Sequence, residues 1–321
     1  MKNAFFPRPL DGRPGDLFRP WFLSDPKEKA MPRLKKKAPS KPKKASASKN
    51  PKKKTAKKTP ALKTPKPAKP KVVGFDPEVK VYPTPETLVQ EMAHLVMQTS
   101  REAVNERGRF VVALSGGTTP KGLFQQLTEE PYLSLIPWPK TFIFWVDERH
   151  VPLTHETSNY RMTQEYLLSK VPVPKENIFP ATNGSQPVEK AASAYEIKMG
   201  KFFGADQLPR FDLALLGMGD DGHTASLFPG MPQVNELDKW VVGYYVDAER
   251  KDRVSLTFPV LNAARLQLLL AEGAKKAERL KDVLEGPKDP PRLPVQYLRP
   301  FDGRLVFAVD AAAASLLSKK S

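Results

Sequence analysis

The sequence predicts an α/β fold in which a single doubly wound domain carries a mainly parallel sheet covered by helices on both faces. Two observations lead to this prediction. From Val72 onward, short apolar runs rich in β-branched residues alternate with helical patterns, as they do in chains of βαβ units. Residues 1–71 show no such alternation and are expected to form a disordered tail, whereas residues 72–321 supply the roughly 250 residues that suit one domain of this class.

Strands and helices are expected to alternate along the chain. The run VKVYP precedes a helix from Glu86 to Glu106, FVVALSGG precedes a helix from Lys121 to Leu127, and TFIFWVDE precedes a helix from Tyr160 to Leu168. Four further strands, FDLALLGMG, WVVGYYV, RVSLTF and RLQLLLAEG, complete the series, and a helix from Lys275 to Leu284 follows the last one. Such continuous apolar runs are typical of strands that are buried on both faces of a sheet.

The first helix has recognisable ends and one buried face. Thr84 or Thr87 offers an N-cap, and Gly108 is a suitable stop just before the next strand. Its apolar side chains recur at three- and four-residue steps and therefore share one face of the helix: Leu88, Met92, Leu95 and Val96. We therefore expect this helix to be scaffold.

The tail carries almost all of the unbalanced charge of the chain. Residues 27–71 contain 18 lysines and one arginine against a single acid, Glu28, so this segment carries +18 while the whole chain carries +17. Everything outside the segment therefore sums to −1, and the high isoelectric point says nothing about the substrate of the folded domain. With almost no large apolar side chains to bury, the segment cannot offset the entropic cost of ordering.

Two functions remain open for the tail. Its composition resembles the tails of linker histones and ribosomal proteins, which predicts a non-specific tether for nucleic acid or another polyanion through residues 27–71. The alternative is a solvated extension that only improves solubility. The aromatic-rich residues 1–26 could dock on a partner or on the domain, and we expect them to be unstructured.

Several classes of function are excluded or disfavoured by composition. The chain has no cysteine, which excludes thiol nucleophiles, disulfides and zinc-thiolate sites and fits a reducing compartment. No apolar run approaches the roughly 20 residues that span a bilayer, and the first residues lack a signal-peptide core, so we expect a cytoplasmic protein without membrane contact. The four histidines form no metal-binding spacing, so no metal is expected.

The loop after FVVAL predicts an anion cradle. Ser115, Gly116, Gly117 and Thr118 stand where a strand ends and a helix begins, so the glycines allow close approach and the helix N-terminus offers free N–H groups. In open α/β sheets, ligands bind at the carboxyl ends of the strands, where this loop lies. The loop lacks the GxGxxG and Walker patterns, so no nucleotide cofactor is expected.

Two further loops bring acid–base groups to the same edge of the sheet. After FDLALL, the run GMGDDGH places three glycines and two acids beside His223, and the neighbouring Asp221 can fix the tautomer of its imidazole. After FIFWV, the run DERHVP adds Asp147 and Arg149. These residue types favour a catalytic site over a merely solvated set of loops.

Five segments together resemble the 6-phosphogluconolactonases of the pentose phosphate pathway. They are SGGTTP, DERHVP with HETSNY, GMGDDGHTASLFPG, RVSLTFPVLNAARLQLLLAEGAKKA and PVQYL, and the similarity runs in order from about Val79 to the end of the chain. The resemblance implies hydrolysis of 6-phospho-D-glucono-1,5-lactone to 6-phospho-D-gluconate by a water molecule that a histidine activates without a metal or cofactor.

The resemblance also implies roles for particular residues. It makes His223 the general base, Asp221 its orienting partner and Asp147 a further acid of the catalytic site. It supplies cations for the substrate phosphate from Arg253, Lys276 and Arg149, beside the Ser115–Thr118 cradle. The GxxKA spacing selects Lys276 over the adjacent Lys275.

Two alternative functions remain beside this one. Glucosamine-6-phosphate deaminases share a GxGxDGH element, but they typically have DEY where this chain has DER, and a glutamate shortly after the histidine where this chain has ASLFP, so the acid of the deaminase is missing. The other alternative is a polyanion-binding architectural protein that acts through its basic tail. A domain with a net charge near −1 that keeps the acid–base loops argues against this second alternative.

Overall fold

The computed structural model describes residues 76–318, and every expectation about residues 1–71 lies outside this range. Its centre is a six-stranded sheet in which all neighbouring strands are parallel. The strand order is β1 (Glu78–Tyr82), β9 (Arg304–Asp310), β8 (Leu266–Ala271), β5 (Leu213–Gly217), β2 (Phe110–Leu114) and β3 (Thr141–Trp145). The predicted α/β class with a mainly parallel sheet is therefore confirmed.

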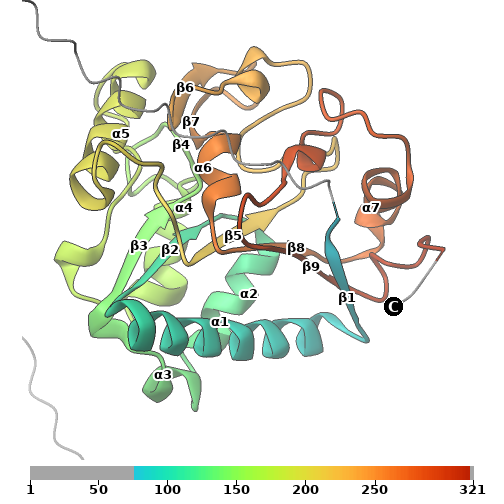
Figure 1. Ribbon diagram of the computed structural model, residues 1–321, viewed down its shortest axis with the longest axis horizontal. Coiled ribbons are helices and arrows are strands. Elements are labelled where there is room, and N and C mark those ends of the chain that lie inside the picture. The colour runs from blue at the N-terminus through green and yellow to red at the C-terminus, as the bar shows by residue number, and fades with distance from the viewer. Residues whose placement is uncertain (1–75, 319–321) are drawn as a thin grey trace, which may run out of the picture. The chain divides into compact units, whose positions relative to one another are not determined.

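Helices lie on both sides of this sheet (Figure 1). On one side are α1 (Pro85–Arg107), α2 (Thr118–Leu127) and α3 (Tyr132–Leu135). On the other side are α5 (Val188–Phe203) and α6 (Phe258–Ala263), together with a second, smaller sheet. The remaining helices are α4 (Asn159–Thr163), which continues into one π-helical turn, and α7 (Ala277–Glu285).

The second sheet is a finding that the sequence analysis did not predict. It contains three antiparallel strands in the order β4 (Asp147–Arg149), β7 (Asp252–Leu256) and β6 (Val241–Tyr245). The runs WVVGYYV and RVSLTF, which the sequence analysis placed in one alternating series, form a hairpin here. Strand β9, which lies between β1 and β8 in the large sheet, was not assigned from the sequence.

One residue joins the two sheets. The N–H of Val146, between β3 and β4, donates to the carbonyl of Leu114 in β2 at 2.9 Å, while its own carbonyl accepts from the N–H of Leu256 in β7 at 2.8 Å. The chain thus leaves the parallel sheet at its carboxyl edge and enters the antiparallel sheet directly. The two sheets therefore meet at the edge where ligands bind in this class of fold.

Helix α1 illustrates how the sequence determines the scaffold. The side chain of Thr84 accepts a hydrogen bond from the N–H of Thr87 at 3.2 Å, and Gly108 ends the helix with φ 73°. Both predicted ends are confirmed, because a hydroxyl caps the first turn and glycine alone adopts the left-handed conformation without strain. Leu88, Met92 and Val96 are buried on the face that packs against the sheet.

Candidate active site

A pocket of about 250 Å³ lies at the carboxyl edge of the parallel sheet, where the loops after β2, β3 and β5 meet the β6–β7 hairpin. The predicted residues that line it are Ser115, Gly116, Gly117, Asp147, Arg149, His223 and Arg253. It is also lined by Asn159, Met218, Gly219, Ala225, Ser226, Phe228 and Arg250. Seven of the ten site residues assigned from the sequence therefore line one pocket.

The catalytic pair predicted from GMGDDGH has hydrogen-bonding geometry. Nδ1 of His223 lies 2.5 Å from Oδ1 of Asp221, and the backbone N–H of His223 donates to the same oxygen at 3.1 Å. A carboxylate can only accept, so Nδ1 carries the ring hydrogen and the lone pair of Nε2 is left available. Within residues 76–318, Nε2 has no hydrogen-bond partner.

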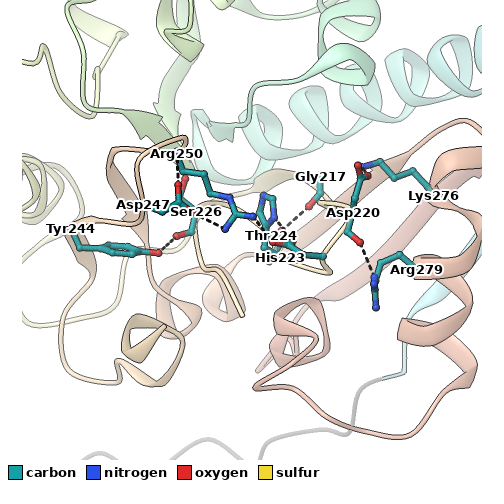
Figure 2. A network of polar contacts seen from close by, with 11 residues as sticks. Gly217, Asp220, His223, Thr224, Ser226, Tyr244, Asp247, Arg250, Lys276 and Arg279 are labelled. Atoms are coloured by element: carbon teal, nitrogen blue, oxygen red, sulfur yellow. Dashed lines mark hydrogen bonds and ion pairs between the residues drawn. The ribbon is translucent and has the colours of Figure 1, made fainter. Parts of the chain in front are cut away.

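Arg250, which the sequence analysis did not single out, holds the other side of this pair (Figure 2). Its guanidinium lies 3.2 Å from Oδ2 of Asp221 and 3.4 Å from Asp247. It also lies over the ring of Phe228 at 4.6 Å, and Phe228 in turn packs on the imidazole of His223 at 4.4 Å. The imidazole is therefore fixed by a carboxylate and by an aromatic ring, and Arg250 contacts both.

The environment of Asp221 keeps its carboxyl ionised. Partial burial by itself raises the pKa, but the hydrogen bonds and charge of His223, with the charge of Arg250, outweigh it and lower the pKa of Asp221 to about 2. The carboxyl group therefore remains an acceptor at any physiological pH. This is the state that a residue must have if it is to orient an imidazole.

The glycines of this loop make room for the pair. A Cβ atom on Gly219 would lie 2.0 Å from Nδ1 of His223, so any side chain there would displace the ring. Gly222 has φ 83°, in the region that favours glycine. The loop is closed by hydrogen bonds from the N–H of Gly219 to the carbonyl of His223 at 2.9 Å and from Thr224 Oγ1 to the carbonyl of Gly217 at 2.9 Å.

Asp147 lies in the pocket lining and binds its neighbours through both carboxylate oxygens. Ser226 Oγ donates to Oδ2 at 2.6 Å, and Asn159 Nδ2 lies 3.5 Å from Oδ1 and 2.9 Å from the backbone carbonyl. The hydroxyl of Tyr244 donates to the carbonyl of Ser226. Asp147 thus connects β4 to the loop that carries the histidine. A Cβ on Gly116 would lie 1.9 Å from Asn159 Oδ1, which explains the glycine there.

Two arginines face each other across the small sheet. Arg149 of β4 is paired in register with Arg253 of β7, and both line the pocket. Nε of each is buried and has no hydrogen-bond partner within residues 76–318. Burial lowers the pKa of Arg253, and the charge of Arg149 lowers it further. Like charges directly opposite on paired strands repel each other, so this arrangement favours an anion in the pocket.

Glu148, between Asp147 and Arg149 in β4, has a structural role. Its carboxylate accepts from the N–H groups of Arg149, Asn159 and Tyr160 at 2.7–2.8 Å and from Ser158 Oγ at 3.1 Å. Burial raises the pKa of Glu148 to about 7 against the opposing effect of these N–H donors. The side chain is 1% exposed and caps the start of α4, and it does not line the pocket.

Two predicted binding residues lie outside the pocket lining. The ammonium of Lys276 lies 2.5 Å from Oδ1 of Asp220, whose backbone carbonyl accepts from Nε of Arg279 at 2.8 Å (Figure 2). Thr118 is the first residue of α2 and is exposed. In this structure, the cations that line the pocket are Arg149, Arg250 and Arg253.

The site residues that were not predicted differ in whether the sequence contained a signal for them. Ser226 and Phe228 lie inside the run GMGDDGHTASLFPG, and Asn159 lies inside HETSNY, so each was within reach of the motifs. Arg250 lies in the exposed-looking hairpin AERKD, where nothing in the local sequence indicates a contact with Asp221.

No group of three or more His, Asp or Glu side chains between residues 76 and 318 is arranged to hold a metal ion. None of the helices in this range is long and apolar enough to span a membrane.

The fold and the pocket together define a class. An imidazole is held by a carboxylate beside an arginine pair, at the carboxyl edge of a parallel sheet. This arrangement is typical of acid–base enzymes that act on anionic substrates. The sequence profile of the glucosamine-6-phosphate isomerases/6-phosphogluconolactonase family matches residues 83–307. The chain belongs to this family.

Named relatives narrow the type of enzyme. Probable 6-phosphogluconolactonase 2 of Oryza sativa subsp. indica is 36% identical over 258 residues, which cover 76% of this chain and 91% of the relative. The 6-phosphogluconolactonase of Synechocystis sp. is 36% identical over 243 residues, which cover 75% of this chain and 98% of the relative. These relatives support an enzyme of the lactone hydrolase type.

Solved structures agree with this placement. The 6-phosphogluconolactonase from Trypanosoma cruzi superposes with a TM-score of 0.69 at 29% identity, covering 77% of this chain and 99% of that one. A monomeric glucosamine-6-phosphate deaminase superposes with a TM-score of 0.64 at 20% identity, covering 74% of this chain and 99% of that one, which shows a shared fold.

Proposed function

We propose that the protein hydrolyses 6-phospho-D-glucono-1,5-lactone to 6-phospho-D-gluconate, in the oxidative branch of the pentose phosphate pathway. The observation that carries the proposal is the content of one pocket: the available Nε2 of His223 and the two opposed guanidiniums of Arg149 and Arg253. The first can accept a proton from water, and the second can bind a phosphate dianion. The names of the relatives supply the lactone.

The phosphate is proposed to bind the arginine pair. The buried Nε–H groups of Arg149 and Arg253 have no acceptor in the described part of the chain, so phosphate oxygens would satisfy them. Binding would also neutralise the repulsion between the two strands. Ser115, Gly116 and Gly117 line the same pocket, at the N-terminus of α2, and would add backbone donors.

The chemistry then begins with a water molecule at Nε2 of His223. The imidazole takes a proton as the water oxygen attacks the lactone carbonyl carbon, and ionised Asp221 stabilises the imidazolium that forms. The resulting tetrahedral oxyanion needs donors placed in advance, for which we propose backbone N–H groups of the glycine-rich loops. Collapse breaks the bond between this carbon and the ring oxygen, which receives the proton from His223.

Four further residues take supporting roles in the proposal. Asp147 positions the histidine loop through Ser226, so its effect on catalysis is indirect. Arg250 positions the carboxylate of Asp221 from the opposite side. Lys276 is proposed to assist phosphate binding by exchanging its bond with Asp220 for one with the substrate. Thr118, in the first turn of α2, is assigned to the same cradle.

A coupled assay tests this proposal. Purified protein should hydrolyse fresh 6-phosphogluconolactone faster than the spontaneous reaction, and His223→Ala should abolish most of the acceleration. The same preparation should not release ammonia from glucosamine 6-phosphate. Turnover of the amino sugar phosphate without turnover of the lactone would replace the proposal by deamination. Metal-free hydrolysis is part of the proposal, and turnover in the presence of a chelator tests it.

The rest of the chain enters the proposal only through composition. We propose that residues 72–321 suffice for catalysis and that the lysine-rich residues 27–71, which lie outside the described range, contact polyanions without taking part in the reaction. A cytoplasmic location stays a prediction, since several of the rice relatives are named chloroplastic.

A further inference from the structure

A second charged cavity lies at the opposite, amino-terminal edge of the parallel sheet. It measures about 530 Å³ and is lined by the arginine cluster, which we define as Arg107, Arg109, Arg210 and Arg265. These arginines come from the last residue of α1 and from the segments that lead into β2, β5 and β8. Because the strands between the two edges are five or six residues long, at about 3.3 Å per residue, this cavity lies well apart from the catalytic pocket.

The lining of this cavity contains one acid for its four arginines. Asp212 is buried, and its carboxylate accepts from the N–H of Val111 at 2.8 Å and from Nε of Arg107 at 2.9 Å. Nε of Arg265 lies 3.4 Å from the same carboxylate. The need to pair one buried aspartate therefore accounts for the presence of Arg107, and in part of Arg265, in the cavity. It does not account for Arg109 or Arg210.

Acids at the rim do not balance the remaining charge. Asp302 pairs with Arg210, and Glu106 pairs with Arg107, but their side chains are 87% and 66% exposed. Ion pairs that are this exposed are screened by water and contribute little, so they can be exchanged for a ligand at low cost. The centre of the cavity keeps an excess of positive charge.

The guanidiniums have unused hydrogen-bonding capacity. Nε of Arg210 is buried and has no partner within residues 76–318. The guanidinium of Arg109 lies over the ring of Phe202 at 4.6 Å, which fixes its plane while leaving its N–H groups free of any described acceptor. Burial and the charges of Arg210 and Arg107 lower the pKa of Arg265. A multivalent anion would satisfy these donors and relieve their mutual repulsion.

The lining of the cavity also contains apolar side chains. They are Phe203, Leu208 and Val111, beside Gln207, and Leu208 is 38% exposed. A ligand that matches both the arginines and these side chains has several phosphate charges and an apolar or aromatic ring. We propose that the arginine cluster binds the diphosphate group of a nucleoside diphosphate or triphosphate, with the base against Phe203 and Leu208. Inorganic pyrophosphate shares the diphosphate group, and the apolar side chains favour the nucleotide.

Calorimetric titration of the full chain with ADP, and separately with pyrophosphate, tests this site. The informative variants are Arg210→Gln and Arg265→Gln, and each should weaken ADP binding at least about tenfold, as expected for losing a charge-assisted contact. Arg292→Gln is the matched control, since it removes the same charge from a side chain that is 72% exposed and lies outside the cavity. Residues 27–71 are identical in all these proteins, so any anion binding by that segment cancels in the comparison.

A further variant separates this site from the proposed active site. Arg253→Gln should leave ADP binding unchanged, and Arg210→Gln and Arg265→Gln should leave lactone turnover unchanged. The carboxylate partner of Arg210, Asp302, is exposed, so Arg210→Gln is the variant that should also keep the unfolding temperature of the wild type. ADP that binds at least about tenfold more tightly than pyrophosphate would support the nucleoside part of the proposal, and equal affinity would reduce it to a diphosphate site. If the wild-type protein binds neither ADP nor pyrophosphate, the proposed site is refuted. It is also refuted if Arg292→Gln weakens ADP binding as much as the cavity variants do, or if only Arg253→Gln weakens it.

Discussion

Replacing Arg253 by glutamine separates phosphate binding from chemistry. In the proposed complex, this side chain contributes one charge-assisted contact to a phosphate dianion, worth about 1.5–3 kcal/mol. Arg253→Gln should therefore lower kcat/KM for 6-phosphogluconolactone by roughly 10- to 150-fold. Unphosphorylated gluconolactone makes no such contact, so its kcat/KM should change by less than about twofold.

The same substitution should not destabilise the fold. Arg253 stands opposite Arg149 in the β4–β7 register, and its buried Nε lacks an acceptor within residues 76–318. Removing one of two like charges from paired strands relieves a repulsion of about 0.2–1 kcal/mol. The free energy of unfolding of Arg253→Gln, measured in urea without substrate, should equal or slightly exceed that of the wild type.

Two comparisons make the result decisive. Lys275→Gln removes an exposed charge beside the pocket-facing loops and should behave like the wild type, whereas Lys276→Gln should show a smaller loss on the phosphorylated lactone than Arg253→Gln. A coupled assay with both lactones measures each value. Equal losses on the two lactones, or clear destabilisation of Arg253→Gln, would refute the assignment of the arginine pair to the phosphate.

Further predictions concern the acid–base pair, its support and the basic segment. His223→Ala should lower turnover at least about 100-fold while the unfolding temperature is retained, as measured by the coupled assay and calorimetry. Asp221→Asn should lower turnover less, and it should remove a stabilisation that the wild type has above about pH 4 and loses as pH falls through about 2, seen in urea unfolding at several pH values. Arg250→Gln should reduce kcat with little change in KM, whereas Lys251→Gln on the same hairpin should not. Deleting residues 1–71 should preserve turnover and abolish any salt-dependent binding to DNA.

The fold class was predictable because its evidence is local. Helix α1 has its apolar period and both of its end signals in its own residues, and the apolar strands β1, β2 and β8 are followed by α1, α2 and α7. The antiparallel sheet was missed although a signal existed. Only six residues separate β6 from β7, too few for the crossover that two parallel strands need, so the hairpin follows from the loop length.

The candidate site was predictable to the extent that its residues lie in strand-end loops. Asp221 and His223 lie in the loop after β5, and Arg149 lies in β4, which follows β3, so the topology brings all three to one edge. The support of Asp221 by Arg250 was not predictable, because it joins two loops 29 residues apart through a side chain whose neighbours give no pattern. The pairing of Lys276 with Asp220 spans 56 residues, and it was not predictable for the same reason.

The junction of the two sheets explains why the proposed site needs both. The parallel sheet supplies tight loops that can hold an imidazole and expose backbone N–H groups, but no cation from its own strands lines the pocket. The antiparallel sheet supplies two arginines on adjacent strands, where cross-strand pairing fixes their separation. Val146 bonds to both sheets, and Asp147, the next residue, bonds to the histidine loop through Ser226. The position of His223, the proposed general base, relative to the arginine pair is therefore set by two consecutive residues. A substitution at Asp147 should disturb catalysis through geometry rather than through loss of a reacting group.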